Sequence, residues 1–321
     1  MNFNKIQGVD GKIRLDKVIL GAASFGANIS KELSYQMMDR YYEIGGRTID
    51  TARFYAMWIH NGVSRSEKMV GDWVRDRGVR DEMTIITKGG HPEYRNMTYS
   101  RLAPECIEYD INTSLCVLGM DYVDVYCLHR DDERTPVNEI VDVMDNVVKE
   151  GFAKSIGVSN WSAKRLNEAN EYAKKHNKTM FSTSQIQWSM AKCRHEDMLD
   201  KTLYFMDEEE YEAYLENKIP VMAYSPQAVG FFSKYLTSGE TNLSDRARMY
   251  CTDINKKRAE KVRELCDEMS CTPAALCIAY LTCNPVDGYA VISNSTMKQM
   301  EDTLTGVDLK ISQDIVNWIL K

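Results

Sequence analysis

The regular alternation of short apolar runs with amphipathic segments is the feature that most constrains the fold of this chain. The apolar runs are rich in β-branched residues, which is the pattern of strands that are buried on both faces of a parallel sheet. Eight such runs are spread over the whole length: Val18–Leu20, Thr48–Asp50, Met83–Thr87, Tyr122–Leu128, Ser155–Val158, Phe181–Ile186, Pro220–Tyr224 and Ala290–Ser293.

Helices are predicted between these runs. Apolar residues repeat every three or four positions in 33–44, 107–118 and 140–148, and a glycine follows each stretch. Another helix is predicted after Thr272, where a capping threonine precedes Pro273 in the first turn. Strand and helix therefore alternate, as they do in α/β proteins with a parallel sheet.

Two α/β folds show this alternation, an open doubly wound sheet and a closed barrel. An open sheet that binds a dinucleotide carries G-x-G-x-x-G after its first strand, but the segment GAASFGANIS at 21–30 lacks the third glycine. Eight strand and helix units in 321 residues instead predict a (β/α)8 TIM barrel. We expect one domain over residues 1–321, with the active site at the C-terminal mouth of the barrel.

Charge and composition exclude several classes of protein. A net charge of −7 argues against nucleic acid as a partner, because phosphate backbones are bound by clustered Lys and Arg. No run supplies the roughly 20 apolar residues of a membrane span. The nine cysteines form no C-x-x-C pair and the first residues lack an apolar signal core, so we expect a reduced, cytoplasmic protein. Cys193 and His195 have no further ligands near them, and no metal site is predicted.

Four reactive side chains follow successive predicted strands, at the ends that meet at the mouth of a barrel. Asp50 ends the run RTID, Tyr55 lies in the next loop, Lys88 ends MTIITK and His129 ends YVDVYCLH. Each alone has an ordinary structural explanation, such as a turn cap or a solvated strand end. Together they supply a specific chemistry, in which a lysine held by an aspartate lowers the pKa of a tyrosine and makes it a usable acid. The histidine would donate a hydrogen bond to a carbonyl oxygen.

The four residues match the Asp, Tyr, Lys, His tetrad of the aldo-keto reductase superfamily in order and in strand context, and the chain resembles that family over nearly its whole length. The resemblance implies an oxidoreductase that transfers a hydride between NAD(P)H and an aldehyde or ketone, with Tyr55 as the proton donor. An alternative within the same resemblance is a nicotinamide-binding regulatory subunit with little turnover, similar to potassium-channel β subunits. The reverse reaction, oxidation of an alcohol, would use the same residues.

The resemblance also implies cofactor contacts. Ser159 and Asn160 in SIGVSNW resemble the residues that hold the nicotinamide carboxamide, and Gln185 in STSQIQW matches the glutamine that joins them. Tyr224 resembles the aromatic residue that stacks under the nicotinamide ring. The other expected contacts lie in loops after the first, seventh and eighth strands: Gly21, Ala22, Ala23, Ser225, Pro226, Ser293, Asn294, Ser295 and Gln299.

The choice between NADPH and NADH depends on the loop at 293–299. Many relatives carry a basic residue there that grips the 2′-phosphate, and this chain has serine and asparagine instead, with Lys298 nearby. We expect NADPH, with NADH possible.

Aromatic residues after the predicted strands suggest the substrate. Trp58, His91, Trp161 and Trp188 are expected to approach the mouth, where flat rings suit a sugar-like or polyphenolic carbonyl compound. The segments KGGHP, LHRDD and SNWS also resemble bacterial members of the family that act on sugars or glycosides. The opposite interpretation is that the tryptophans pack the loops against the barrel. The sequence does not indicate an oligomeric state.

Overall fold

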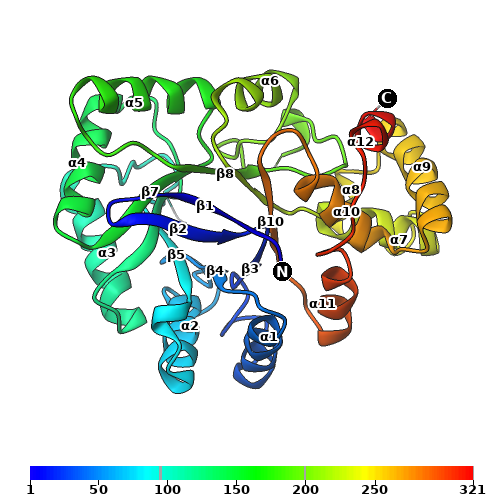
Figure 1. The fold of residues 1–321 in the computed structure, drawn as a ribbon, viewed down its shortest axis with the longest axis horizontal. Coiled ribbons are helices and arrows are strands. Elements are labelled where there is room, and N and C mark those ends of the chain that lie inside the picture. Colours follow the sequence, from blue (N-terminus) through cyan, green and yellow to red (C-terminus); the bar gives the residue numbers. More distant parts are fainter. Residues whose placement is uncertain (94–95, 199, 321) are drawn as a thin grey trace.

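The structure, a computed structural model, describes residues 1–93, 96–198 and 200–320. Its centre is a closed barrel of parallel strands in the order β10-β3-β4-β5-β6-β7-β8-β9 (Figure 1). The strands are β3 (Val18–Gly21), β4 (Thr48–Asp50), β5 (Thr84–Gly89), β6 (Val123–Leu128), β7 (Ala153–Ser159), β8 (Thr183–Gln187), β9 (Val221–Tyr224) and β10 (Gly288–Ile292). The predicted (β/α)8 barrel and its eight strands are confirmed.

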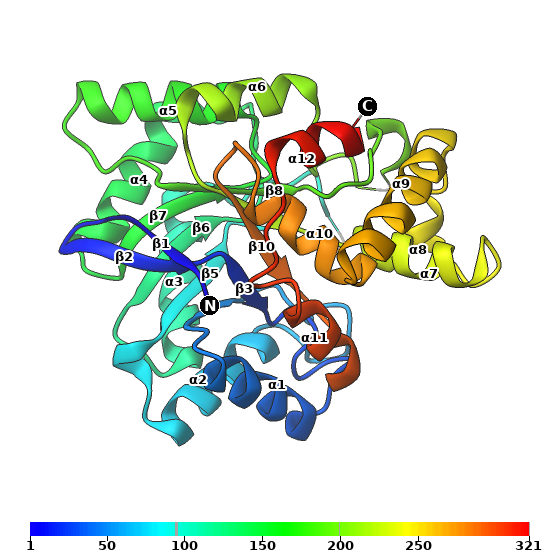
Figure 2. The same ribbon diagram turned by 45° about the vertical axis from the view of Figure 1, so that its right-hand side comes forward.

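Helices surround the barrel, and Figure 2 shows the segment from α7 to α9, together with α12, extending to one side of it. The helix predicted after Thr272 begins at Pro273, and the Thr272 side chain accepts a hydrogen bond from the backbone N–H of Ala275 (3.2 Å). The helices are α1 (Lys31–Glu43), α2 (Arg65–Arg77), α3 (Pro104–Leu118), α4 (Val137–Lys149), α5 (Ala163–Lys175), α6 (Glu208–Asn217), α7 (Phe231–Ser238), α8 (Asp245–Arg248), α9 (Asp253–Met269), α10 (Pro273–Thr282), α11 (Met297–Leu304) and α12 (Gln313–Leu320).

An N-terminal hairpin that we did not predict covers one end of the barrel. Its antiparallel strands β1 (Phe3–Gly8) and β2 (Gly11–Asp16) lie against the first residues of several barrel strands, and Thr84 at the start of β5 donates a hydrogen bond to the Arg14 carbonyl (2.8 Å). The hairpin side chains Ile6, Ile13 and Leu15 belong to one apolar cluster with residues inside the barrel. The barrel residues of this cluster include Ile86, Val125 and Met222. The hairpin therefore closes the N-terminal end, which leaves the C-terminal mouth for function.

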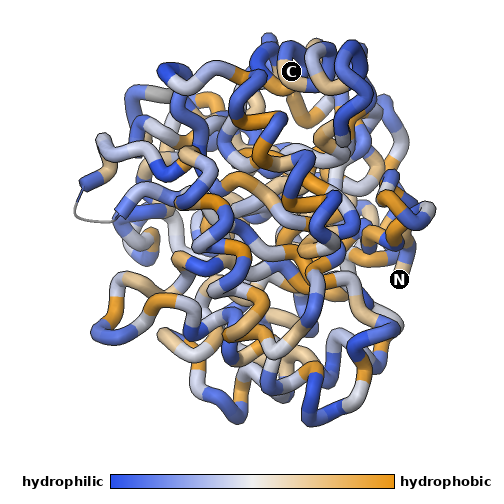
Figure 3. The backbone as a smooth tube through the Cα atoms, turned by 90° about the vertical axis from the view of Figure 1, so that its left-hand side faces the viewer, coloured by the Kyte–Doolittle hydropathy of each residue, from blue (hydrophilic) through white to orange (hydrophobic). Residues whose placement is uncertain are grey.

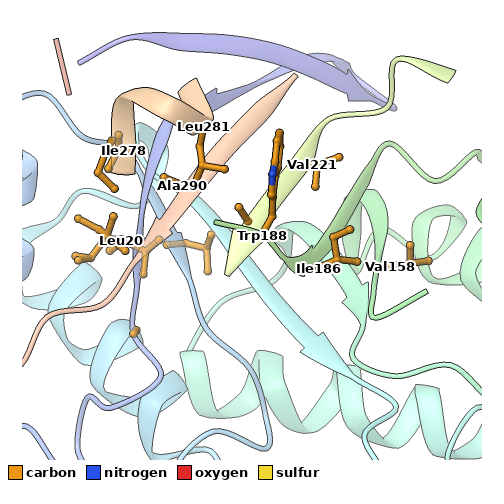
Figure 4. Packing of buried hydrophobic residues seen from close by; sticks show 14 of the residues in the cluster. Leu20, Val158, Ile186, Trp188, Val221, Ile278, Leu281 and Ala290 are labelled. Atoms are coloured by element: carbon orange, nitrogen blue, oxygen red, sulfur yellow. The ribbon is translucent and has the colours of Figure 1, made fainter. Parts of the chain in front are cut away.

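A second apolar layer lies between the barrel and its helices. Figure 3 shows hydrophobic segments concentrated inside the molecule and hydrophilic segments on its outside. Leu20, Ile186, Val221 and Leu281 belong to this layer, and Figure 4 shows them packed together. Within the described ranges, no helix has the length and apolar character needed to span a membrane.

Candidate active site

The structure brings the predicted tetrad together at the C-terminal mouth. Lys88 Nζ at the end of β5 lies 2.7 Å from Asp50 Oδ2 at the end of β4, and 2.9 Å from the Tyr55 hydroxyl. A third hydrogen bond joins Lys88 Nζ to the carbonyl oxygen of Thr51 (2.9 Å). Lys88 has no exposed surface, so its ammonium is stable in the interior because these three acceptors replace its hydration.

The histidine of the tetrad faces the tyrosine. The rings of His129 and Tyr55 meet edge to face, with centroids 5.5 Å apart. His91 lies on the other side of His129, at 4.8 Å between ring centroids, and stacks on Phe54 at 5.2 Å. Two imidazoles and a phenol therefore lie next to one another at the mouth.

Burial controls the ionisation of these groups. It lowers the pKa of His129 well below its ordinary value, and together with the charge of Arg130 it lowers the pKa of His91 to about 4. Both imidazoles are therefore neutral near pH 7. The pKa of Lys88 is raised, because its attraction to Asp50 and its bond to Tyr55 exceed the opposing effect of burial.

One part of the sequence prediction is wrong in its net direction. We expected Lys88 to lower the pKa of Tyr55 below its usual value. Lys88 does act in that direction, but burial of the phenol raises the pKa more strongly and Asp50 adds to the rise, so the net pKa is raised. Tyr55 is consequently a protonated acid throughout the neutral range, and Lys88 limits how weak that acid becomes.

The residues expected to hold the nicotinamide form one hydrogen-bonded network with the tetrad. Gln185 Nε2 donates to Asp50 Oδ1 (3.0 Å), and the Ser159 hydroxyl donates to the Gln185 carbonyl (3.0 Å). Asn160, at a φ of 59°, donates to Ser159 Oγ (3.1 Å) and accepts from the Tyr224 hydroxyl (2.9 Å). The three polar residues and the aromatic ring thus meet beside the ion pair of Lys88 and Asp50.

The loop after β3 lies beside the same ion pair. Gly21 pairs with Asp50 in the barrel register, and the backbone N–H of Ala22 donates to the Asp50 carbonyl (2.8 Å). Ala23 follows in the next turn. This segment borders the mouth, where it was expected.

The loops after β9 and β10 are joined to each other. The Thr303 hydroxyl in α11 accepts from Gln227 Nε2 (2.9 Å), which follows Ser225 and Pro226, and from Asn294 Nδ2 (2.9 Å). Within this loop pair, the Gln299 side chain accepts from the Ser295 backbone (2.9 Å), and Ser293 is exposed. Asn294 Oδ1 is buried and has no hydrogen-bond partner among the described residues. A buried free acceptor beside an exposed polar loop fits the adenosine half of a dinucleotide, so the residues present fit the expected cofactor.

Two of the four aromatic residues expected at the substrate site lie elsewhere. Trp161 is fully buried, and its ring lies 5.8 Å from that of Phe181 in the apolar core. Trp188 is 3% exposed, and its ring meets those of Tyr211 and Tyr280 edge to face. Figure 4 shows Trp188 among the buried hydrophobic side chains. Both tryptophans therefore hold loops and helices against the barrel, which corrects the expectation that they contact substrate.

The other two aromatic residues lie on the loops that follow β4 and β5. Trp58 is 47% exposed in the loop after β4, and His91 lies at the mouth beside His129. A cavity of about 800 Å³ is lined by Asn160 and by other residues of the loops that follow β5 to β8. Two of its carboxylates, Asp131 and Asp132, are paired with arginines. In the described ranges, no three His, Cys, Asp or Glu side chains are grouped as a metal site would require.

Sequence reasoning missed Arg130, which follows His129 directly. Its side chain is 10% exposed and lies at the mouth, where its charge acts on the tetrad. The signal that could have identified it is its position in LHRDD, one residue beyond a strand-end histidine.

Comparison with known proteins agrees with this geometry. The model of the Aldo/keto reductase family matches residues 17–320. The chain belongs to the aldo/keto reductase family. This membership identifies it as an oxidoreductase enzyme, of a family that acts on small-molecule carbonyl compounds.

Three curated proteins are similar to this aldo/keto reductase over nearly its whole length. Norsolorinic acid reductase of Emericella nidulans is 27% identical over 335 residues, which cover 98% of this chain and 80% of the relative. An uncharacterized oxidoreductase of Bacillus subtilis is 24% identical, with 96% of this chain and 92% of the relative covered. A putative aryl-alcohol dehydrogenase of Saccharomyces cerevisiae is 24% identical, with 96% and 83% covered.

Proposed function

We propose that this aldo/keto reductase uses NAD(P)H to reduce an aldehyde or ketone to an alcohol, with Tyr55 as the proton donor. The observation that carries the proposal is the simultaneous bonding of Lys88 Nζ to Asp50 Oδ2 (2.7 Å) and to the Tyr55 hydroxyl (2.9 Å) beside a neutral histidine. The same residues serve the reverse reaction, because each proton transfer is reversible.

Each residue of the tetrad has a separate task. When bound, NAD(P)H supplies the hydride. Tyr55 transfers its hydroxyl proton to the carbonyl oxygen, and Lys88 stabilises the phenolate that remains. His129, whose imidazole is neutral, donates a hydrogen bond that orients this oxygen. Asp50 fixes the position of Lys88 and neutralises its charge in the interior.

The cofactor contacts follow from the network at the mouth. Ser159, Asn160 and Gln185 would hold the carboxamide, and the ring of Tyr224 would support the nicotinamide. We favour NADPH over NADH because Lys298 is exposed in the first turn of α11, where the N-terminus of the helix also attracts an anion.

The substrate is proposed to be a small carbonyl compound with a ring. Trp58, which is 47% exposed in the loop after β4, offers a flat surface that suits an aromatic or sugar-like molecule. His91 lies beside His129 at the mouth, with Phe54 stacked on its ring. Aromatic aldehydes are the first compounds to test, since one relative is named as a putative aryl-alcohol dehydrogenase.

The proposal is tested by titrating the purified protein with NADPH and NADH, followed by turnover assays. The assays use aromatic aldehydes, quinones and keto-sugars, and oxidation of the cofactor is followed by its absorbance. Binding with turnover is the expected result. Binding without turnover on the whole panel would favour a regulatory nicotinamide-binding subunit, and the absence of binding would overturn the proposal.

A further inference from the structure

Arg130 lies at the mouth and is held there by its own bonds. Its Nη1 donates to the His129 carbonyl (2.9 Å), its Nε to the Thr202 hydroxyl (3.0 Å) and its Nη2 to Asp200 Oδ2 (3.2 Å). The side chain is 10% exposed. Hydrogen bonds to His129, and to Thr202 and Asp200 in the loop after β8, therefore hold the guanidinium next to the tetrad.

The positive charge of Arg130 acts on several titratable groups at the mouth. In Tyr55, His91, His129 and Tyr224 burial is the largest influence on the pKa, and the positive charge of Arg130 also acts to lower the pKa of each. These four side chains surround the place where the reaction is proposed to occur. The hydrogen bonds of Arg130 place its charge beside these groups, at the C-terminal end of β6.

Lys88 and Arg130 differ in the donors they have left. The ammonium of Lys88 has three N–H groups, and Asp50, Tyr55 and Thr51 accept all of them. A guanidinium has five N–H groups. Three of those on Arg130 are used within the described part of the chain, which leaves one on each terminal nitrogen for a ligand.

Asp200 makes a single bond to Arg130 instead of a two-pronged pair, because its Oδ1 already accepts from the backbone N–H (2.9 Å) and the hydroxyl (2.6 Å) of Thr202. A third of the Asp200 side chain is exposed. Arginine favours recognition in which its two terminal nitrogens each donate to one oxygen of a carboxylate, and Arg130 has one N–H left on each of them.

We propose that Arg130 is a specificity-determining residue that binds a carboxylate on the carbonyl substrate. The preferred substrates are then aldehydes or ketones that carry a negative charge near the reacting carbon. This inference rests on the proposed reductase function, and it names the substrate class of that site.

The test compares each carboxybenzaldehyde isomer with the formylbenzamide of the same substitution, which has a similar shape and no charge. The wild-type protein is expected to show a kcat/KM at least roughly tenfold higher for the acid than for the amide in one ring position, as a charged hydrogen-bonded pair implies. In Arg130→Gln this preference should be lost, mainly through a higher KM for the acid. Arg130→Lys should retain only part of the preference for the acid, because lysine lacks the planar pair of N–H donors of a guanidinium.

Arg80→Gln is the matched control. Arg80 pairs with Asp124 (2.9 Å) and donates to the carbonyls of Met83 and Tyr122, but it precedes β5 at the opposite end of the barrel. The ratio of acid to amide should be unchanged in this variant.

Three results separate the possibilities. An equal rate for acid and amide in the wild-type protein would overturn the role of Arg130, even if the variants do not fold. Equal losses on both compounds in Arg130→Gln would show a purely structural role and overturn it as well. No cofactor oxidation with either compound, or with any neutral carbonyl, would count against the reductase function itself.

Discussion

The buried ion pair and the loop after β10 lie at the same mouth but are built in opposite ways. Lys88 has no exposed surface and Asp50 is 1% exposed, and each is bonded to several partners. In the loop, Ser293, Ser295 and Gln299 are exposed, and the bonds of Ser295 and Gln299 are made within the loop and the first turn of α11. The ion pair is fixed by the interior. The loop is fixed by contacts within itself and with α11, and through Thr303 it is joined to the loop after β9.

This difference has an energetic cause. A buried charge that loses its partner is strongly destabilising, so each residue around Lys88 requires the others. An exposed polar loop can change residue types at little cost to stability, because water replaces lost bonds. The chemistry of the site is therefore determined more strictly than the choice between cofactors.

Tyr55→Phe is expected to have the largest effect on the buried region. The change removes the hydroxyl proton and keeps the ring, so turnover should fall by roughly a thousandfold or more. Cofactor affinity, measured by fluorescence titration, should be nearly the same as in the wild-type protein. Turnover close to the wild-type rate would exclude Tyr55 as the proton donor.

Lys88→Met tests the charge that tunes this acid. Burial raises the pKa of Tyr55 and Lys88 lowers it, so loss of the ammonium should raise the pKa further. Tyr55 then stays protonated to higher pH, and the alkaline limb of the kcat/KM profile should move upward while the rate falls roughly a hundredfold.

The same variant leaves Asp50 as an unpaired buried charge, which should lower the free energy of unfolding by about 3–5 kcal/mol. Urea unfolding measures that loss and shows whether the protein assayed is folded. An alkaline limb at the wild-type position in a folded variant would contradict the tuning role.

The barrel and the tetrad were predictable because both leave marks that are local in the sequence. Buried parallel strands are continuous apolar runs, and Asp50, Lys88 and His129 end three of them. The hairpin of β1 and β2 was missed because its apolar residues are few and are separated by lysine and arginine, although Asp10-Gly11 is a recognisable turn signal.

How deeply a side chain is buried, and in which direction it points, could not be predicted from the sequence. The net rise in the pKa of Tyr55 depends on how completely the folded chain covers the phenol. Trp161 and Trp188 follow strand ends as expected, but the strand ends do not reveal whether the rings turn toward the mouth or the core. The donors left on Arg130 appear only when its partners in the loop after β8 are known.

Gln185→Met tests the residue that joins the two regions through the cofactor. It removes the bond to Asp50 Oδ1 (3.0 Å) and the proposed carboxamide contact. We expect roughly tenfold losses in both cofactor affinity and turnover. Gln187→Met is the control on the same strand, since it loses a bond to Tyr250 (2.6 Å) and leaves Asp50 untouched. Similar kinetic losses in both variants would show that the effect is a general weakening of β8.

Lys298→Met should have the smallest effect and bears on the exposed region alone. An exposed lysine contributes little to binding a phosphate, so the Kd for NADPH should rise about two- to fivefold and the Kd for NADH should not change. Lys257→Met, at another exposed position on α9, should change neither. A much larger loss of affinity for NADPH would mean that the loop determines the choice of cofactor as strictly as the interior determines the tetrad. If Lys298→Met changes the Kd for neither cofactor, the 2′-phosphate lies away from α11. The contrast between the two regions would then rest on the buried ion pair alone.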